Sequence, residues 1–268
     1  MIRFFDSHAH YDDQRFKNEF PGGTDGALDY SFENNVRAIV NSGSNLETSY
    51  NSILLSQKYA NVFATVGIHP TDSQYIKKGE LETSFLKIEE MAKTEKAVAI
   101  GEIGLDYHYD DTVKEVQKYS FEAQLDIAER LNLPVVIHTR DAMGDTLDIL
   151  DKHKNVRGIF HSFNGSTEII SQYTKRGWYF SYSGPVTYKN ATNVKNAARY
   201  TDEDRIMIET DAPYLPPVPK RGEINVSAFL RYTCEVIAEL REKSLMETAE
   251  ITFNNSCRAF GIDPSMFM

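Results

Sequence analysis

The feature that most constrains the fold of this chain is a regular alternation of short apolar runs with longer amphipathic stretches. Two of the runs, AVAIGE and PVVIH, are apolar almost throughout. That pattern is typical of strands buried on both faces in a parallel sheet. We expect eight strands, which cover Arg3–Asp6, Val36–Asn41, Val62–Gly67, Ala97–Glu102, Pro134–His138, Gly158–His161, Trp178–Ser181 and Arg205–Glu209.

Between and after these runs, apolar residues recur with helical spacing, most clearly over Glu115–Asn132. The other expected helices are Leu46–Tyr59, Leu81–Glu95, Met143–His153, Ser166–Arg176, Asn190–Tyr200, Val226–Glu242 and Leu245–Phe260. Eight such alternations in 268 residues predict an α/β fold with a single (βα)8 TIM barrel, which needs about 250 residues, and one domain over residues 1–268. A doubly wound open sheet is the alternative, but the Gly-rich dinucleotide fingerprint is missing after the first strand.

Composition narrows the classes of function. A net charge of −10 argues against a broad electrostatic grip on nucleic acid, although bound divalent cations would reverse the local potential. No apolar stretch approaches the roughly 20 residues of a membrane helix, and Arg3 and Asp6 interrupt the N-terminal apolar run. We therefore expect neither a membrane span nor a secretory signal. We interpret Cys234 and Cys257 as buried apolar residues and expect a cytoplasmic location.

Side chains that can bind metals recur where the expected strands end. His8 and His10 are one residue apart, so on an extended chain they share a face, and Asp6 points the same way. The other such residues are His69, Glu102, His138, His161 and Asp211. In a barrel the C-terminal ends of the strands converge, so these residues predict a metal centre rather than isolated polar strand ends.

The number of ligands predicts two divalent cations, with Zn²⁺ or Mn²⁺ favoured over Mg²⁺ by the mixture of nitrogen and oxygen donors. His8, His10 and Asp211 would hold one ion, His138 and His161 the other, and Glu102 would bridge them. The expected substrate contacts are Arg140, Lys189 and Arg221, which form a candidate phosphate clamp, and His108. We interpret His153 as structural, at a helix C-terminus.

At these residues the chain resembles the TatD family of metal-dependent deoxyribonucleases, within the amidohydrolase superfamily. The matching segments, in order, are FFDSHAHYD, VGIHP, AIGEIGLDY, QKYSFEAQLDIAERLNLPVVIHTRDA, GIFHSFNGS, YFSYSGPVTYKN and MIETDAPYLPP. The resemblance implies a (βα)8 barrel and a divalent metal centre held by His8, His10, Glu102, His138, His161 and Asp211, with His69 beside it and in contact with substrate. Two positions depart from the family pattern: Gly222 follows Arg221 where Asn is usual, and Ser162 stands where relatives often have Cys.

The resemblance also implies hydrolysis of DNA phosphodiester bonds, often from a 3′ end. We expect a water activated by the metal ions to attack, Asp211 to take its proton and His69 to assist the leaving oxygen. The acidic net charge of the chain favours binding of single-stranded DNA or of a DNA end over binding of a long duplex. Three alternatives remain. The first is hydrolysis of an ester or amide, such as an aminoacyl-RNA ester. The second is a phosphotriesterase or lactonase activity, for which a carboxylated lysine would be favoured in place of Glu102, and the third is a non-catalytic metal-binding module.

We expect the segment 11–30 to be a surface loop or a lid.

Overall fold

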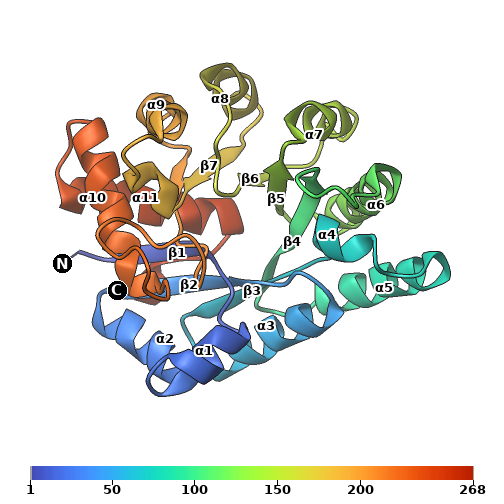
Figure 1. Ribbon diagram of the computed structural model, residues 1–268, viewed down its shortest axis with the longest axis horizontal. Coiled ribbons are helices and arrows are strands. Elements are labelled where there is room, and N and C mark those ends of the chain that lie inside the picture. The colour runs from blue at the N-terminus through green and yellow to red at the C-terminus, as the bar shows by residue number, and fades with distance from the viewer. Residues whose placement is uncertain (1, 268) are drawn as a thin grey trace. The chain divides into compact units, whose positions relative to one another are not determined.

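The computed structural model describes residues 2–267 (Figure 1). The chain divides into two compact units, and we describe each by itself. Unit 1 combines the residues up to Asn41 with those from His161 onward, and unit 2 comprises Ser42–Phe160. The expectation of one domain stays a prediction.

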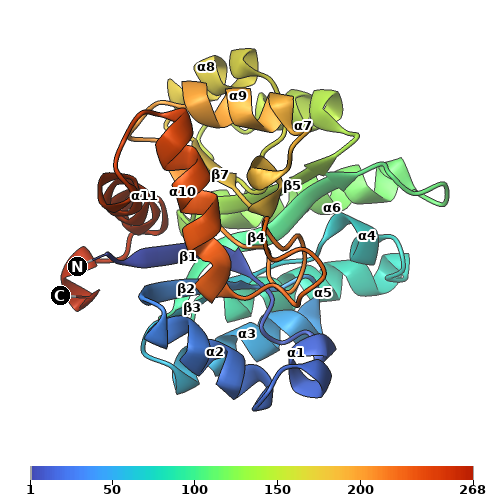
Figure 2. The ribbon, with the colours of Figure 1, turned by 60° about the vertical axis from the view of Figure 1, so that its left-hand side comes forward.

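Unit 1 contains the first two strands and the last two. Its elements are β1 (Phe4–Ala9), α1 (Gln14–Glu19), α2 (Gly23–Glu33), β2 (Val36–Ser42, whose last residue belongs to unit 2), α8 (Thr167–Thr174), β7 (Tyr179–Tyr182), η1 (Gly184–Thr187), α9 (Thr192–Tyr200), β8 (Ile206–Ile208), η2 (Ser227–Phe229), α10 (Leu230–Leu240), α11 (Leu245–Phe260) and η3 (Pro264–Phe267). Strand β1 pairs in parallel with β2, and β7 with β8. Helices α10 and α11 pack beside β1 (Figure 2).

Unit 2 is continuous in sequence. Its elements are α3 (Leu46–Lys58), β3 (Val62–Val66), α4 (Pro70–Ser73), α5 (Lys78–Met91), β4 (Ala97–Asp106), α6 (Lys114–Leu131), β5 (Val135–Arg140), α7 (Met143–Leu150) and β6 (Gly158–Phe160). The pairings β3–β4, β4–β5 and β5–β6 are all parallel. Every residue of β4 is buried, which explains its nearly unbroken apolar sequence.

The strand order in the sheet is the chain order, β1 to β8, and helical segments separate each strand from the next. That alternation of parallel strands and helices defines the (βα)8 barrel class, so the expected fold class is confirmed. Among residues 2–267, no helix combines the length and apolar character needed to cross a membrane.

The structure corrects the expectation of a surface loop for the segment 11–30, which is mostly helical, and a role as a lid stays a prediction. Asp13 caps α1 by accepting a hydrogen bond from the backbone N–H of Arg15. The buried ring of Phe16 stacks on that of Tyr11, with the centroids 4.7 Å apart. The sequence pattern did not reveal α1 and α2 because they are short and rich in glycine and charged residues, and α1 buries only Phe16.

Strands β1 and β4 also extend further than expected, to Ala9 and Asp106. His8 and Glu102 therefore lie inside strands. Polar residues in a sequence suggest the end of a buried strand, but here hydrogen bonds keep them in the sheet. The backbone N–H of Glu102, for example, donates to the carbonyl of Gly43 at 2.8 Å.

Helix α6 fixes the strand ends of unit 2 through two buried glutamines. The side chain of Gln124 accepts from the N–H of Ile68 and donates to its carbonyl, and the side chain of Gln117 accepts from the N–H of Asp106. At Gly104 (φ +140°), a Cβ would lie 2.0 Å from the carbonyl oxygen of His138. Only glycine therefore allows β4 to approach β5 this closely.

Neither cysteine should react with a thiol reagent in the native protein. Burial raises the pKa of Cys234 to about 12 and that of Cys257 to about 11, so both thiols stay protonated at pH 8. We expect Ellman's reagent to detect no thiol at pH 8 until denaturant is added, and then to detect both. Rapid reaction of either cysteine in the folded protein would contradict the packing described here.

Candidate metal centre

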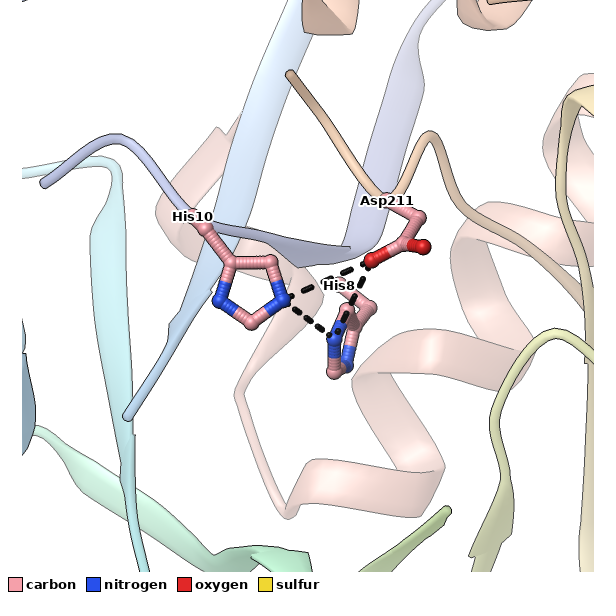
Figure 3. A group of neighbouring side chains, drawn as sticks. All are labelled: His8, His10 and Asp211. Atoms are coloured by element: carbon pink, nitrogen blue, oxygen red, sulfur yellow. Dashed lines mark hydrogen bonds and ion pairs between the residues drawn. The ribbon is translucent and has the colours of Figure 1, made fainter. Parts of the chain in front are cut away.

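Three metal-binding side chains of unit 1 converge on one point (Figure 3). The Nε2 atoms of His8 and His10 are 3.1 Å apart. Oδ1 of Asp211 lies 3.6 Å from Nε2 of His8 and 3.4 Å from Nε2 of His10. His8 is fully buried, while His10 and Asp211 retain about 15% exposure, so the cluster opens on one side.

Main-chain hydrogen bonds bring these residues together from opposite ends of the sequence. The N–H of Asp211 donates to the carbonyl of His8 at 2.9 Å, and the N–H of His10 donates to the carbonyl of Ala212 at 2.7 Å. Asp211 adopts a left-handed conformation (φ +57°), which L-residues rarely adopt and which clusters at functional sites.

The cluster fits a small divalent cation. Two ligands bound to Zn²⁺ at 2.0–2.1 Å with tetrahedral geometry are about 3.3 Å apart. The three observed donor separations, 3.1, 3.4 and 3.6 Å, bracket that value. Burial alone raises the pKa of Asp211, but the hydrogen bond from His10 and the nearby His161 and His8 outweigh it and lower the pKa. Asp211 is therefore an anion at neutral pH, as a ligand must be.

His161 lies next to this cluster, with its ring stacked on that of His8 at a centroid distance of 4.1 Å. Its Nδ1 faces Oε1 of Glu209 at 3.1 Å, and the same oxygen accepts the N–H of Ser162 at 2.7 Å. Metal-binding histidines commonly direct their second nitrogen at a buried carboxylate in this way. Glu209 was not selected from the sequence, although it precedes Asp211 by only two residues in the segment MIETDAPYLPP.

Asp6 is a second residue of unit 1 that the sequence did not assign to the site. Its buried carboxylate accepts hydrogen bonds from the hydroxyls of Thr210 and Ser227 and from the N–H groups of Thr210 and His8. Burial raises the pKa of Asp6 to about 7, and these hydrogen bonds oppose the rise. Asp6 therefore ties β1 to the chain that leads to Asp211.

Unit 2 carries its own histidine–carboxylate cluster. Oε1 of Glu102 lies 2.8 Å from Nδ1 of His138 and 3.6 Å from Nε2 of His69. Nε2 of His138 faces Oδ2 of Asp106 at 3.1 Å. Burial alone raises the pKa of Asp106, but the hydrogen bond with His138, the N–H of His108 and the nearby imidazoles together outweigh it and lower the pKa. His69, Glu102 and His138 are close enough together to hold a metal ion.

The backbone near His69 determines which of its ring nitrogens faces Glu102. His69 caps α4: its Nδ1 accepts a hydrogen bond from the N–H of Thr71. In the neutral ring the proton then resides on Nε2, which faces Glu102. In this tautomer His69 can donate a hydrogen bond at Nε2, and it could bind a metal through Nε2 only after losing that hydrogen.

The predicted substrate contacts lie in both units. In unit 1, Lys189 is exposed, and the exposed Arg221 places its guanidinium 4.4 Å from the ring centroid of Tyr188. In unit 2, Arg140 lies 5.7 Å from the ring centroid of Tyr109, and Nδ1 of the exposed His108 faces Asp141 at 3.1 Å. Their contact with substrate stays a prediction.

A further group of possible ligands, Asp126, Glu129 and His153, lies on the surface of unit 2. Nδ1 of His153 is 3.6 Å from Oδ1 of Asp126. Two members are exposed carboxylates, and the sequence assigned His153 a structural role.

Comparison with known proteins connects this geometry to a family. The sequence model of the family described as TatD related DNase matches residues 5–261. The chain belongs to this family. It is 37% identical over 261 residues to the uncharacterized metal-dependent hydrolase YabD of Bacillus subtilis, covering 97% of this chain and 99% of that protein. It is 40% identical over 207 residues to YcfH of Escherichia coli, named in the same way, covering 76% of each.

A solved structure of a TatD homologue has the same fold as this chain. The crystal structure of YjjV, a TatD homologue from Escherichia coli, superimposes with a TM-score of 0.88 at 26% identity, covering 98% of this chain and 99% of that one. The TatD family and the (βα)8 barrel are thus both shown, and the class of activity that comes with them is metal-dependent hydrolysis.

Replacing Glu209 with Gln should weaken metal binding. The substitution keeps the acceptor for Ser162 but removes the negative charge behind His161, and losses of such supporting groups typically cost about 10-fold in affinity. Titration with Zn²⁺ against a competing chelator would measure the change. The matched control is Glu239→Gln on the exposed surface of α10, and equal affinities for the two variants would contradict a role of His161 in binding metal.

Proposed function

We propose that this protein is a metal-dependent deoxyribonuclease that hydrolyses DNA phosphodiester bonds from a 3′ end. The observation that carries the proposal is the His8–His10–Asp211 cluster in a member of the TatD related DNase family. Its donor spacing suits a divalent cation, and the cluster keeps an open side for a substrate oxygen.

The protein residues have separate roles. A divalent cation, when bound, lowers the pKa of water and polarises a phosphoryl oxygen. Asp211 has one carboxylate oxygen toward both histidine rings and the other directed away from them (Figure 3). The first oxygen serves as ligand, and the second is available to accept the proton of the attacking water.

His69 would assist the leaving oxygen by donating a hydrogen bond from Nε2, because in the neutral ring that nitrogen carries the hydrogen. Arg140, Lys189, Arg221 and His108 are proposed to contact the phosphates and neighbouring groups of the strand. Lys189 and Arg221 lie exposed on the surface of unit 1, and both are more accessible than Arg140. The bridging role of Glu102 stays a prediction.

The proposed partner is DNA that is single-stranded or has a free end. A net charge of −10 provides little long-range attraction for a duplex, so recognition has to come from a few close contacts. We further propose two cations, Zn²⁺ or Mn²⁺ ahead of Mg²⁺, because both units offer imidazole nitrogen beside carboxylate oxygen.

Metal analysis should count two tightly bound equivalents per chain. His10→Ala should remove one equivalent and His138→Ala the other, because each variant takes a nitrogen from a different cluster. Mass spectrometry of metals after dialysis would give the count. His153→Ala is the control for the surface group and should leave the count unchanged. A single equivalent in the wild-type protein, lost in either variant, would show that the clusters do not bind separate ions.

Asp211→Asn should lower the rate of DNA cleavage by about 100-fold or more, because the amide cannot accept the proton. The measurement is turnover of a 3′-labelled oligonucleotide, single-stranded or duplex, after reconstitution with Mn²⁺ or Zn²⁺. Asp148→Asn, on the exposed face of α7, is the control for the same chemical change. Full turnover by the metal-loaded Asp211→Asn protein would overturn the assignment.

A panel of esters and amides, including an aminoacyl-RNA ester, separates the proposal from its alternatives. Faster hydrolysis of a carbonyl substrate than of any oligonucleotide would replace the deoxyribonuclease assignment.

Glu102→Ala should abolish whichever activity is found, because Glu102 contacts both His69 and His138.

A further inference from the structure

An exposed aromatic ring stands beside the His8–His10–Asp211 cluster. Tyr214 follows Asp211 by three residues, and its N–H donates to the carbonyl of Asp211 at 2.8 Å. The rings of Tyr214 and His10 meet edge to face, with the centroids 5.9 Å apart and an interplanar angle of 80°. Tyr214 nevertheless keeps 44% of its surface exposed. A molecule bound at the cluster would therefore meet this ring.

The ring is held in place by a second group of residues. The hydroxyl of Tyr214 donates to Oδ2 of Asp13 at 2.9 Å. The guanidinium of Arg15 lies 4.1 Å from the ring centroid of Tyr214 and forms two hydrogen bonds with Asp13. Because the hydroxyl and both neighbours are engaged with one another, the ring cannot turn without breaking several contacts. A fixed ring loses little conformational freedom when a ligand stacks on it.

The pattern of contacts shows which surface of Tyr214 is available. Arg15 lies over one face of the ring, His10 meets the ring at nearly a right angle, and Asp13 binds the hydroxyl. The 44% of Tyr214 that stays exposed is the surface left for a flat, uncharged partner. The charge of Arg15 is balanced by Asp13, so the group offers a stacking surface rather than a phosphate site.

We propose that Tyr214 stacks against an unpaired nucleobase at the end of the DNA strand. This inference rests on the proposed function and identifies the feature of the substrate that is recognised. Bases stack on aromatic side chains only when they are released from a duplex, so the platform selects frayed or single-stranded ends. Because the hydroxyl is already bound to Asp13, recognition is by the ring face and is indifferent to the identity of the base.

The test is a cycle of two proteins and two ligands. The proteins are the wild type and Tyr214→Leu, which keeps apolar bulk but removes the planar ring. The ligands are a fluorescent single-stranded oligonucleotide with a normal 3′-terminal base and an identical one whose last residue is abasic. Both carry phosphorothioate linkages at the 3′ end to slow cleavage. Fluorescence anisotropy in the presence of Mn²⁺ gives each Kd.

Stacking predicts that Tyr214→Leu weakens binding of the base-ended oligonucleotide by about 5- to 100-fold and changes that of the abasic one by less than about 2-fold. Tyr214→Phe keeps the ring but loses the hydrogen bond to Asp13, so it should retain most of the preference for the base-ended oligonucleotide. Tyr200→Leu, an exposed tyrosine of α9, is the control for the substitution itself. An equal loss on both oligonucleotides, or no loss on either, would overturn the inference and leave Tyr214 a structural role.

Cleavage of the corresponding unmodified oligonucleotides separates this inference from the proposed function. If the wild type cleaves neither one with Mn²⁺ or Zn²⁺, the deoxyribonuclease assignment fails. The binding cycle still decides whether Tyr214 recognises a base. If the wild type cleaves DNA but the cycle shows no dependence on the terminal base, only the stacking platform is rejected.

Discussion

Two main-chain hydrogen bonds determine where the metal-binding side chains of unit 1 lie. One joins the N–H of Asp211 to the carbonyl of His8, and the other joins the N–H of His10 to the carbonyl of Ala212. They place the residues that come after β8 beside the end of β1, so that a carboxylate faces two imidazoles at close to ligand spacing. The backbone therefore sets the positions of His8, His10 and Asp211 before their side chains bind a ligand. Asp6 strengthens the same junction through Thr210 and Ser227.

Both clusters also control the orientation of their histidines. Glu209 faces Nδ1 of His161, and the N–H of Thr71 binds Nδ1 of His69. In each case the bond made by one ring nitrogen decides which nitrogen is left for chemistry. These contacts give the two imidazoles different predicted roles: His161 is a predicted metal ligand, and His69 is a hydrogen-bond donor.

The sequence alone predicted the fold class and the grouping of His8 and His10 with Asp211, because apolar runs identify strands and strand ends converge in a barrel. It paired His138 with His161, whereas in the structure His138 lies beside Glu102 and His69, and His161 stacks on His8. Apolar runs identify strands, and a spacing of two places His8 and His10 on one side. Glu209 and Asp106 lie in the segments MIETDAPYLPP and AIGEIGLDY but were not assigned to the site, since a sequence does not show which carboxylate faces a histidine ring nitrogen. The platform of Asp13, Arg15 and Tyr214 depends on contacts across about 200 positions of sequence, which no local pattern reports. Helices α1 and α2 were missed for a different reason, because they lack a strong apolar face.

The two units differ in how their residues are distributed along the chain, and this affects synthesis. Unit 2 is a continuous stretch, so Glu102 and His138 have both been synthesised before His161 is added to the chain. Unit 1 combines the segments on either side of unit 2, so His8 meets its carboxylate partner only after Asp211 has been made. A nascent chain therefore exposes the first histidine pair without that carboxylate, and the cluster in unit 1 is complete only after all of unit 2 has been translated.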